Sequence, residues 1–222
     1  RPDRIALFGY AHVPWMAKKQ RLIDEAALPG SVERRAQAEA ASIALVATGY
    51  QAIGIDHFAL PEDPLAVAAR AGTLHRNFQG YTTDQAETLI GLGSTSIGRT
   101  PWGYVQNISE TGAWSRAVMA GQLPVAKGHE LSAADRARAQ VIEQLMCEGA
   151  ADLEAVRRAY GQDDGWCDDA LANLAPMVGD NLVELDRDTV RLSEHAKPLA
   201  RVAAAAFDTY FQSARARHSV AV

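Results

Sequence analysis

Apolar and polar stretches alternate along the first third of the chain in a pattern that predicts strands and helices in turn. Residues 5–11 form a short continuous apolar run, which is typical of a buried strand. Ser31 is a suitable N-cap for a helix that runs to about Thr48. Residues 51–59 form a second apolar run, and residues 64–72 form a short helical pattern. A strand, a helix and a strand with short connections predict a parallel βαβ unit and an α/β fold.

The first predicted helix has one apolar face. Apolar residues recur there at steps of three and four, at Val32, Ala36, Ala40, Ile43 and Ala47. Small side chains on such a face suit close packing, so we expect this face to pack on the sheet.

Polar residues follow both predicted strands. His12 comes after the first strand, and Asp56 and His57 lie at the second. Ligands bind at the C-terminal edge of parallel α/β sheets, so these side chains are candidates for a binding site. The alternative is that His12 and His57 are hydrogen-bonded loop residues, and the residues alone leave both possibilities open.

The chain changes character between residues 76 and 99. Residues 77–83 form a polar–aromatic loop whose donors, acceptors and two rings suit a ligand wall. Residues 91–98 (GLGSTSIG) invite comparison with a dinucleotide-binding loop, but their glycines are spaced two and five apart, which departs from G-x-G-x-x-G. Pro101 follows closely and argues against a helix there. We therefore expect a last buried strand that backbone or ligand approaches closely.

After Gly128 the pattern becomes mostly helical. The predicted elements are helices over 132–148, 152–160 and 167–178, a β-hairpin over 182–192 and a final helix over 195–211. Ser132 to Asp135 resembles a capping box at the start of the first of these helices. Three helices, a hairpin and a closing helix resemble a winged-helix arrangement. We predict one domain over residues 1–120 and a second over residues 121–222.

Charge argues against the nucleic-acid binding that winged-helix domains often perform, which stays a third alternative. Residues 187–222 carry six Lys or Arg and three Asp or Glu, a local sum of +3, while the whole chain has a net charge of −5. A structural or lid role for the second domain is therefore favoured over DNA binding. The acidic balance also argues against an anionic membrane as a partner.

Composition sets further limits on the class of protein. Hydrophobic residues make up 48% of the chain and charged residues 22%, as in soluble globular proteins. No apolar run approaches membrane-spanning length, and the first residues lack the pattern of a signal peptide, so we predict a cytoplasmic location.

The two cysteines supply neither a disulfide scaffold nor a cluster of three or four thiolates. Cys147 has apolar neighbours and is predicted to belong to the core. Cys167 lies among four acidic residues, which would raise its pKa and make it a poor nucleophile. No H-E-x-x-H, C-x-x-C or G-x-S-x-G motif is present, and the histidines show no close ligand spacing. Spacing alone therefore predicts a ligand-binding α/β protein without a defined chemistry.

Several motifs resemble one known family, the oxygen-independent coproporphyrinogen III oxidases. They are YAHVP at residues 10–14, GIDHFA at 54–59, HRNFQGYTT at 75–83 and FDTY at 207–210. The resemblance extends from about Arg4 to Tyr210, and the third motif is its most specific part. The second motif is shared with related heme chaperones.

The resemblance implies a radical reaction that uses S-adenosylmethionine. In the family, a [4Fe–4S] cluster reductively cleaves this cofactor, and the 5′-deoxyadenosyl radical removes a hydrogen from a propionate side chain. Each substrate radical then loses CO2 and one electron, so that two propionates of coproporphyrinogen III become the vinyl groups of protoporphyrinogen IX, in heme biosynthesis. Two S-adenosylmethionine molecules occupy the family's site. The resemblance names no electron donor or acceptor, and we expect the full-length protein to be a monomer.

The resemblance also implies four cofactor-binding residues and assigns no catalytic residue. Ala11 falls where the family lines the second S-adenosylmethionine, and Ile97 falls where it contacts the first. Phe78 and Gln79 occupy positions close to the cofactors that the family needs for activity. The last assignment agrees with the separate interpretation of residues 77–83 as a ligand wall.

One departure from the family is large. The C-x-x-x-C-x-x-C cluster motif, its neighbouring Tyr and the Gly-rich cofactor segment are absent. An apolar run begins four residues into a chain that lacks an initial Met. We therefore expect a C-terminal portion of a longer enzyme: the last βα units of an incomplete (β/α) barrel, followed by the winged-helix-like domain. The alternative is a heme- or porphyrin-binding relative without catalysis, against which the HRNFQGYTT motif argues.

Overall fold

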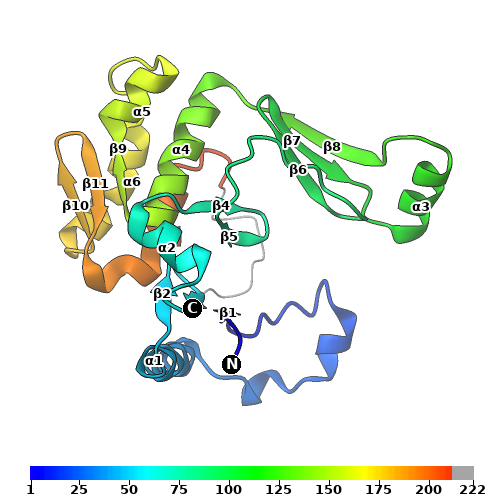
Figure 1. Ribbon diagram of the computed structural model, residues 1–222, viewed down its shortest axis with the longest axis horizontal. Helices are drawn as coiled ribbons and strands as arrows, with labels where there is room; N and C mark the ends of the chain where they lie inside the picture. Colours follow the sequence, from blue (N-terminus) through cyan, green and yellow to red (C-terminus); the bar gives the residue numbers. More distant parts are fainter. Residues whose placement is uncertain (212–222) are drawn as a thin grey trace.

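The computed structural model describes residues 1–211 as a mixed α/β protein (Figure 1). The helices are α1 (Ser31–Ala47), α2 (Pro64–Ala71), α3 (Thr111–Met119), α4 (Ala133–Glu148), α5 (Leu153–Tyr160), α6 (Asp168–Gly179) and α7 (Ala200–Ala205), with the short 3-10 helices η1 (Lys18–Leu22), η2 (Glu25–Ala27) and η3 (Glu194–Leu199). The strands are β1 (Arg4–Ala6), β2 (Gln51–Ile53), β3 (His57–Ala59), β4 (His75–Asn77), β5 (Gly80–Thr82), β6 (Ile97–Thr100), β7 (Gly103–Asn107), β8 (Val125–Glu130), β9 (Ala150–Asp152), β10 (Val183–Asp186) and β11 (Thr189–Leu192).

The parallel βαβ unit predicted for the first third is wrong. The apolar run 51–59 is not one strand, because the chain turns at Gly54, whose φ is +58°. It returns as β3, which lies between β1 and β2 and pairs antiparallel with both. The first strand is also shorter than predicted, since β1 ends at Ala6. All the ladders among the described residues are antiparallel.

The bounds of α1 agree with the prediction, but the expected packing of its apolar face does not. No residue of α1 is buried, and Val32, Ile43 and Val46 are 77%, 64% and 51% exposed. The adjoining sheet has only three strands of three residues each, which leaves most of this helix without a surface to cover. Gly30 rather than Ser31 is the N-cap.

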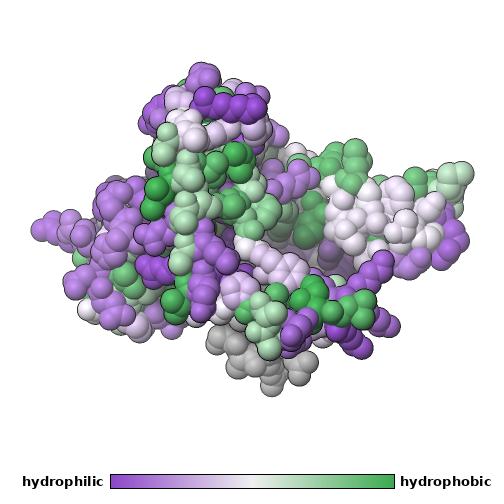
Figure 2. All heavy atoms as spheres, turned by 90° about the horizontal axis from the view of Figure 1, so that it is seen from below, coloured by the Kyte–Doolittle hydropathy of each residue, from purple (hydrophilic) through white to green (hydrophobic). Residues whose placement is uncertain are grey.

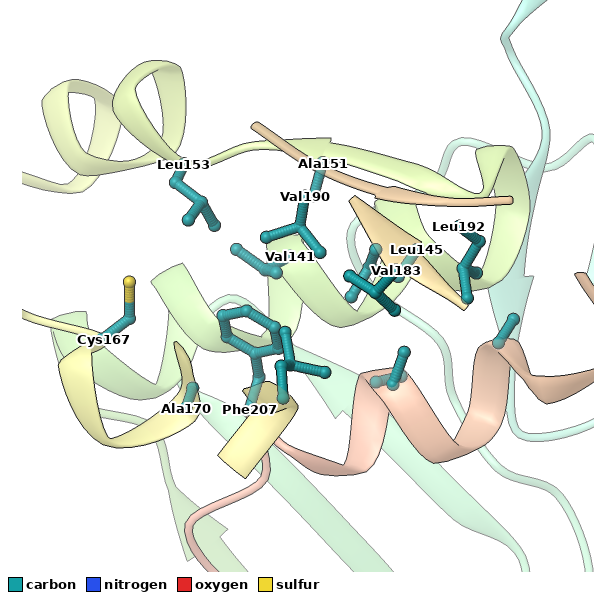
Figure 3. Close-up of a cluster of buried hydrophobic side chains, with 14 of the residues drawn as sticks. Val141, Leu145, Ala151, Leu153, Cys167, Ala170, Val183, Val190, Leu192 and Phe207 are labelled. Atoms are coloured by element: carbon teal, nitrogen blue, oxygen red, sulfur yellow. The ribbon is translucent and has the colours of Figure 1, made fainter. Parts of the chain in front are cut away.

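Two hydrophobic clusters form the core. The buried residues of the larger one all lie between 137 and 207, and they gather side chains of α4 to α7 and β9 to β11 around Phe207 (Figure 3). The partly buried Ile55 packs against this cluster from the first half of the chain. The smaller one lies between 53 and 81 and combines Ile53, Leu65 and Tyr81 with the partly buried Cys147 of α4. The long helix α4 therefore contacts both clusters and joins them.

The helical pattern of the second half is largely confirmed. Ser132 and Asp135 form the predicted capping box on α4, and the predicted hairpin is β10–β11. The predicted final helix is wrong as a continuous element, because the segment around Pro198 forms the 3-10 helix η3 and only Ala200–Ala205 is α-helical. Residues 212–222, which include Arg215 and Arg217 of the local charge count, lie outside the described residues.

A three-stranded sheet and α3 form an arm that projects from the rest of the molecule (Figures 1 and 2). The sequence analysis did not predict α3, β7 or β8. Strand β8 lies beyond residue 120 and pairs with β7, so the sheet crosses the predicted domain boundary. None of the helices within residues 1–211 has the length and apolar character that crossing a membrane requires.

The phenol of Tyr81 locks the turn at Gly54 in place. Its hydroxyl accepts a hydrogen bond from the Ile55 amide at 3.2 Å and donates one to the Met146 carbonyl of α4 at 2.8 Å. A methyl group on Gly54 would overlap this ring. Two features therefore require glycine at position 54: its backbone has a positive φ, and the Tyr81 ring leaves no room for a side chain.

We predict that Gly54→Ala lowers the free energy of unfolding by about 2–5 kcal/mol, because left-handed backbone strain adds to overpacking against Tyr81. Urea denaturation of both proteins measures the loss. Gly72→Ala is the matched control, since Gly72 also has a positive φ (+67°) but has no atom within 4 Å of the position that an added methyl group would take. The control should lose only about 1–2 kcal/mol. Equal losses in the two variants would contradict a role for the Tyr81 ring.

Candidate functional site

Phe78 and Gln79 form the turn of a β-hairpin. The flanking strands β4 and β5 pair with Asn77 opposite Gly80, so the predicted polar–aromatic loop is a tight hairpin whose tip carries both residues. The Asn77 side chain accepts a hydrogen bond from the Gln79 amide at 2.8 Å and stabilises the turn.

The hairpin is fixed from two sides. On one side, Glu143 of α4 lies 3.1 Å from His75 Nδ1 and accepts a hydrogen bond from the Arg76 amide at 3.3 Å. On the other side, the ring of His57 meets the ring of Tyr81 in β5 edge-on, at 5.2 Å between centroids. These contacts give the tip a defined position, as a binding site requires.

Three of the four predicted cofactor residues line one pocket of about 420 Å³. They are Phe78, Gln79 and Ile97, and the other lining residues come from 89–92 and from 95–96. Phe78 is 54% exposed, and its ring meets that of Tyr104 edge-on at 5.3 Å between centroids. The hairpin tip and the start of β6 therefore form a common wall.

The GLGSTSIG segment is not the buried strand that the sequence predicted. Residues 91–96 form a loop, β6 begins only at Ile97, and Leu92 is exposed. The Asn107 side chain donates hydrogen bonds to the carbonyls of Gly91 and Gly93 at 3.0 and 2.9 Å and holds the loop over the pocket. The segment leads into a strand rather than a helix, unlike a dinucleotide-binding loop.

Ala11 is separate from this pocket. It is exposed in the loop after β1 and is not among the residues that line the pocket. Its carbonyl accepts a hydrogen bond from the Gln20 side chain at 3.1 Å, and Gln20 also accepts one from the Val13 amide at 2.6 Å. The loop at Ala11 therefore has its own support, within the segment 11–20.

The two histidines that follow β1 and β2 have partners of their own. His12 lies 3.0 Å from Glu25, and Nδ1 of His57 lies 2.7 Å from Asp56. Arg201 of α7 also approaches Asp56, at 3.7 Å. These contacts support the interpretation of both histidines as hydrogen-bonded residues, although His57 begins β3 and does not lie in a loop. Within residues 1–211, no three His, Cys, Asp or Glu side chains are grouped as metal ligands.

The environment of the two thiols does not fit an iron–sulfur cluster. Burial, with a smaller contribution from Glu143, raises the pKa of Cys147 to about 12. Burial also raises the pKa of Cys167, and Asp168 and Asp169 act in the same direction. The prediction that Cys167 is a poor nucleophile is thus supported, although burial and not the acidic neighbours is the largest cause of its raised pKa. Two cysteines in the whole chain cannot supply the thiolates of a cluster.

Sequence analysis missed Tyr104, which contacts Phe78. The available signal was weak, because the strand GYVQN at 103–107 has no alternation of apolar and polar residues. Its role becomes visible only when the hairpin tip is placed beside β7.

Comparison with known proteins finds a solved structure of the same fold. The solved structure of coproporphyrinogen III oxidase (HemN) from Escherichia coli, described as a radical SAM enzyme, matches with a TM-score of 0.88 and 35% identity. The match covers 95% of this chain and 49% of that one. No family model matches the chain.

Curated relatives define the family more closely. Oxygen-independent coproporphyrinogen III oxidases from Bradyrhizobium diazoefficiens and Paracoccus denitrificans are 45% and 46% identical over 221 residues, which are 49% of each relative. The protein of that name from Thermostichus vulcanus is 37% identical over 97% of this chain and 67% of its own length. The chain belongs to the oxygen-independent coproporphyrinogen III oxidase family. It spans about half the length of the first two relatives.

We predict that Cys147 reacts with Ellman's reagent at pH 8 at least 100-fold more slowly in the folded protein than in concentrated guanidinium chloride. With a pKa of about 12, only about one thiol in 10,000 is ionised at that pH. The absorbance of the released thiolate in a Cys167→Ser variant measures the rate for Cys147 alone. Prompt reaction of the folded protein would contradict the buried environment.

Proposed function

We propose that this chain is the C-terminal portion of a longer enzyme that converts coproporphyrinogen III to protoporphyrinogen IX by radical oxidative decarboxylation. Family membership supports the reaction, and the names of the relatives supply the substrate. The observation that carries the proposal is the convergence of Phe78, Gln79 and Ile97 on one pocket.

The pocket residues fit part of an S-adenosylmethionine molecule. Phe78 offers an exposed ring face, Ile97 offers an aliphatic surface, and the Gln79 side-chain amide makes no hydrogen bond within residues 1–211. An adenosyl group can stack on such a ring and pair with such an amide. When bound, S-adenosylmethionine supplies the deoxyadenosyl radical. Phe78 and Gln79 would orient it, and Ile97 would help to keep water from it. We propose that Ala11 contacts a second cofactor molecule from its separate loop.

The chain does not supply a cluster site, and we infer that the cluster-binding half lies outside it. This half would complete an incomplete (β/α) barrel whose last units lie in residues 1–120. The exposed apolar face of α1 supports this inference, because Val32, Ile43 and Val46 would then be covered. Residues 121–222 would contain the winged-helix-like domain, which the core cluster between residues 137 and 207 supports, while β8 would belong to the arm that it forms with β7. The whole enzyme would act as a cytoplasmic monomer, and this chain by itself would be inactive.

We predict that this chain alone, reconstituted with iron and sulfide, shows no absorbance of a [4Fe–4S] cluster, because Cys147 and Cys167 are too few and largely shielded from solvent. Visible absorbance and iron analysis after desalting measure incorporation. The longer protein, which would contain the cluster motif, should incorporate one under the same conditions. Stable cluster incorporation by the short chain would overturn the proposal that the cluster lies elsewhere.

In the longer protein, Gln79→Ala should lower vinyl formation at least 100-fold, since small misplacements of a cofactor cost about that much in rate. Chromatography of the oxidised porphyrin products measures the rate, and circular dichroism shows whether the variant folds. Gln85→Ala is the matched control, because Gln85 is exposed in the following loop and does not line the pocket. Its rate should equal that of the wild type.

Two results would contradict the proposed function. Wild-type turnover in Gln79→Ala would remove this residue from the site. A stoichiometric Soret change on titration with heme, together with no decarboxylation by the longer wild-type protein, would instead identify a non-catalytic heme-binding relative.

A further inference from the structure

One face of the β6–β7–β8 sheet carries two rows of side chains. Side chains on a strand alternate between faces, and the register aligns one row across Arg99, Tyr104 and His129. The second row crosses Ile97, Gln106 and Lys127. The residues of these two rows are called the cationic face below.

The cationic face is turned toward the candidate site. Tyr104 meets the ring of Phe78 at the hairpin tip, and Ile97 itself lines the pocket. Arg99 lies two residues after Ile97 on the same strand and therefore on the same side of the sheet. The two cations thus share a surface with residues of the pocket wall.

These cations are not neutralised by the described part of the protein. Neither Arg99 nor Lys127 forms an ion pair within residues 1–211, and the only hydrogen bond that the Arg99 side chain makes there is a long one, 3.4 Å, to the Ala86 carbonyl. The strands place no carboxylate on this face, since Glu130 lies on the opposite one.

Two acidic groups of α4 on this side of the sheet have other partners. Glu143 contacts His75 and the Arg76 amide, and Asp135 contacts Ser132 and the hydroxyl of Tyr210. A protein with a net charge of −5 therefore keeps an arginine and a lysine without ion-pair partners in residues 1–211 beside its candidate site. Such charges suit an anionic ligand.

We propose that Arg99 and Lys127 bind carboxylate groups of the tetrapyrrole substrate, an inference that rests on the proposed function. Arg99 and Lys127 lie on the two outer strands of the sheet, and their rows are two residues apart along the strands. These offsets place their Cα atoms about 12 Å apart. This separation suits two different propionates of one macrocycle rather than a single carboxylate. Tyr104 lies between them and offers an aromatic surface to the pyrrole rings.

The test measures binding of coproporphyrin III, the stable oxidised form of the substrate, to the longer protein by fluorescence titration. Lys127→Met and Arg99→Met remove the charge and keep an apolar stem. Each should raise the dissociation constant about 10-fold, and the double variant about 100-fold, as expected for lost charge-assisted hydrogen bonds. Lys127→Arg should retain most of the affinity. Lys197→Met on η3, outside this face, is the matched control and should bind as the wild type does.

A second probe separates charge from shape. Coproporphyrin III tetramethyl ester has no ionised carboxylate, so its weaker binding should be the same in the wild type and in the two variants. Thermal melting and dialysis with S-adenosylmethionine show that the variants still fold and still hold the cofactor.

The outcomes separate this proposal from the function on which it rests. If the wild-type protein forms vinyl groups but the double variant binds coproporphyrin III unchanged, the carboxylate site is wrong and the reaction stands. If the wild-type protein neither binds coproporphyrin III nor decarboxylates its reduced form, the proposed function is wrong, and the carboxylate site that rests on it is wrong as well. An equal loss of affinity for the acid and for the ester would also overturn the proposal, because it would show a change of shape rather than of charge.

Discussion

The buried phenol of Tyr81 is the contact on which the arrangement of the site depends. Its hydroxyl joins the Ile55 amide of one hairpin to the Met146 carbonyl of α4, and its own strand belongs to the hairpin that carries Phe78 and Gln79. Burial raises the pKa of Tyr81, so the phenol remains a neutral donor to the carbonyl. The guanidinium of Arg76 covers the ring at 4.6 Å. Loss of this one side chain would remove the hydrogen bonds that join the Gly54 turn to α4, and Glu143 would remain to hold the β4–β5 hairpin there.

Local signals predicted most of the helices, although not α3 or the form of the last one, and predicted the strands poorly. The capping box at Ser132 and the glycines that end α2, α4 and α5 are signals within a few residues, and they placed these helices correctly. The run 51–59 was misinterpreted because its turn depends on Tyr81, 26 residues away. The strands of the arm were missed because β8 is exposed along its whole length and shows no apolar alternation. Such strands are defined by pairing rather than by burial.

The candidate site required information of a different kind. Phe78, Gln79 and Ile97 were assigned from the family motifs, and only the three-dimensional structure shows that they share a pocket while Ala11 does not line it. Arg99 and Lys127 are ordinary surface charges in the sequence, 28 positions apart. Strand register alone puts them on one face, and register is the property that hydrophobic patterning specifies least in an exposed sheet.

The pairing of β8 with β7 across residue 120 has a consequence for how this family can exchange segments. A methyl group on Gly103 would overlap the carbonyl of His129, so the two strands fit each other closely. A chimera of two relatives joined anywhere between Gly103 and Glu130 would combine a strand from one parent with a partner from the other. Two crossover points, one before Leu89 and one at the capped start of α4, would instead transfer the whole arm from a single parent. The arm is therefore the segment that a chimera should exchange as a whole, although it belongs to neither predicted domain alone.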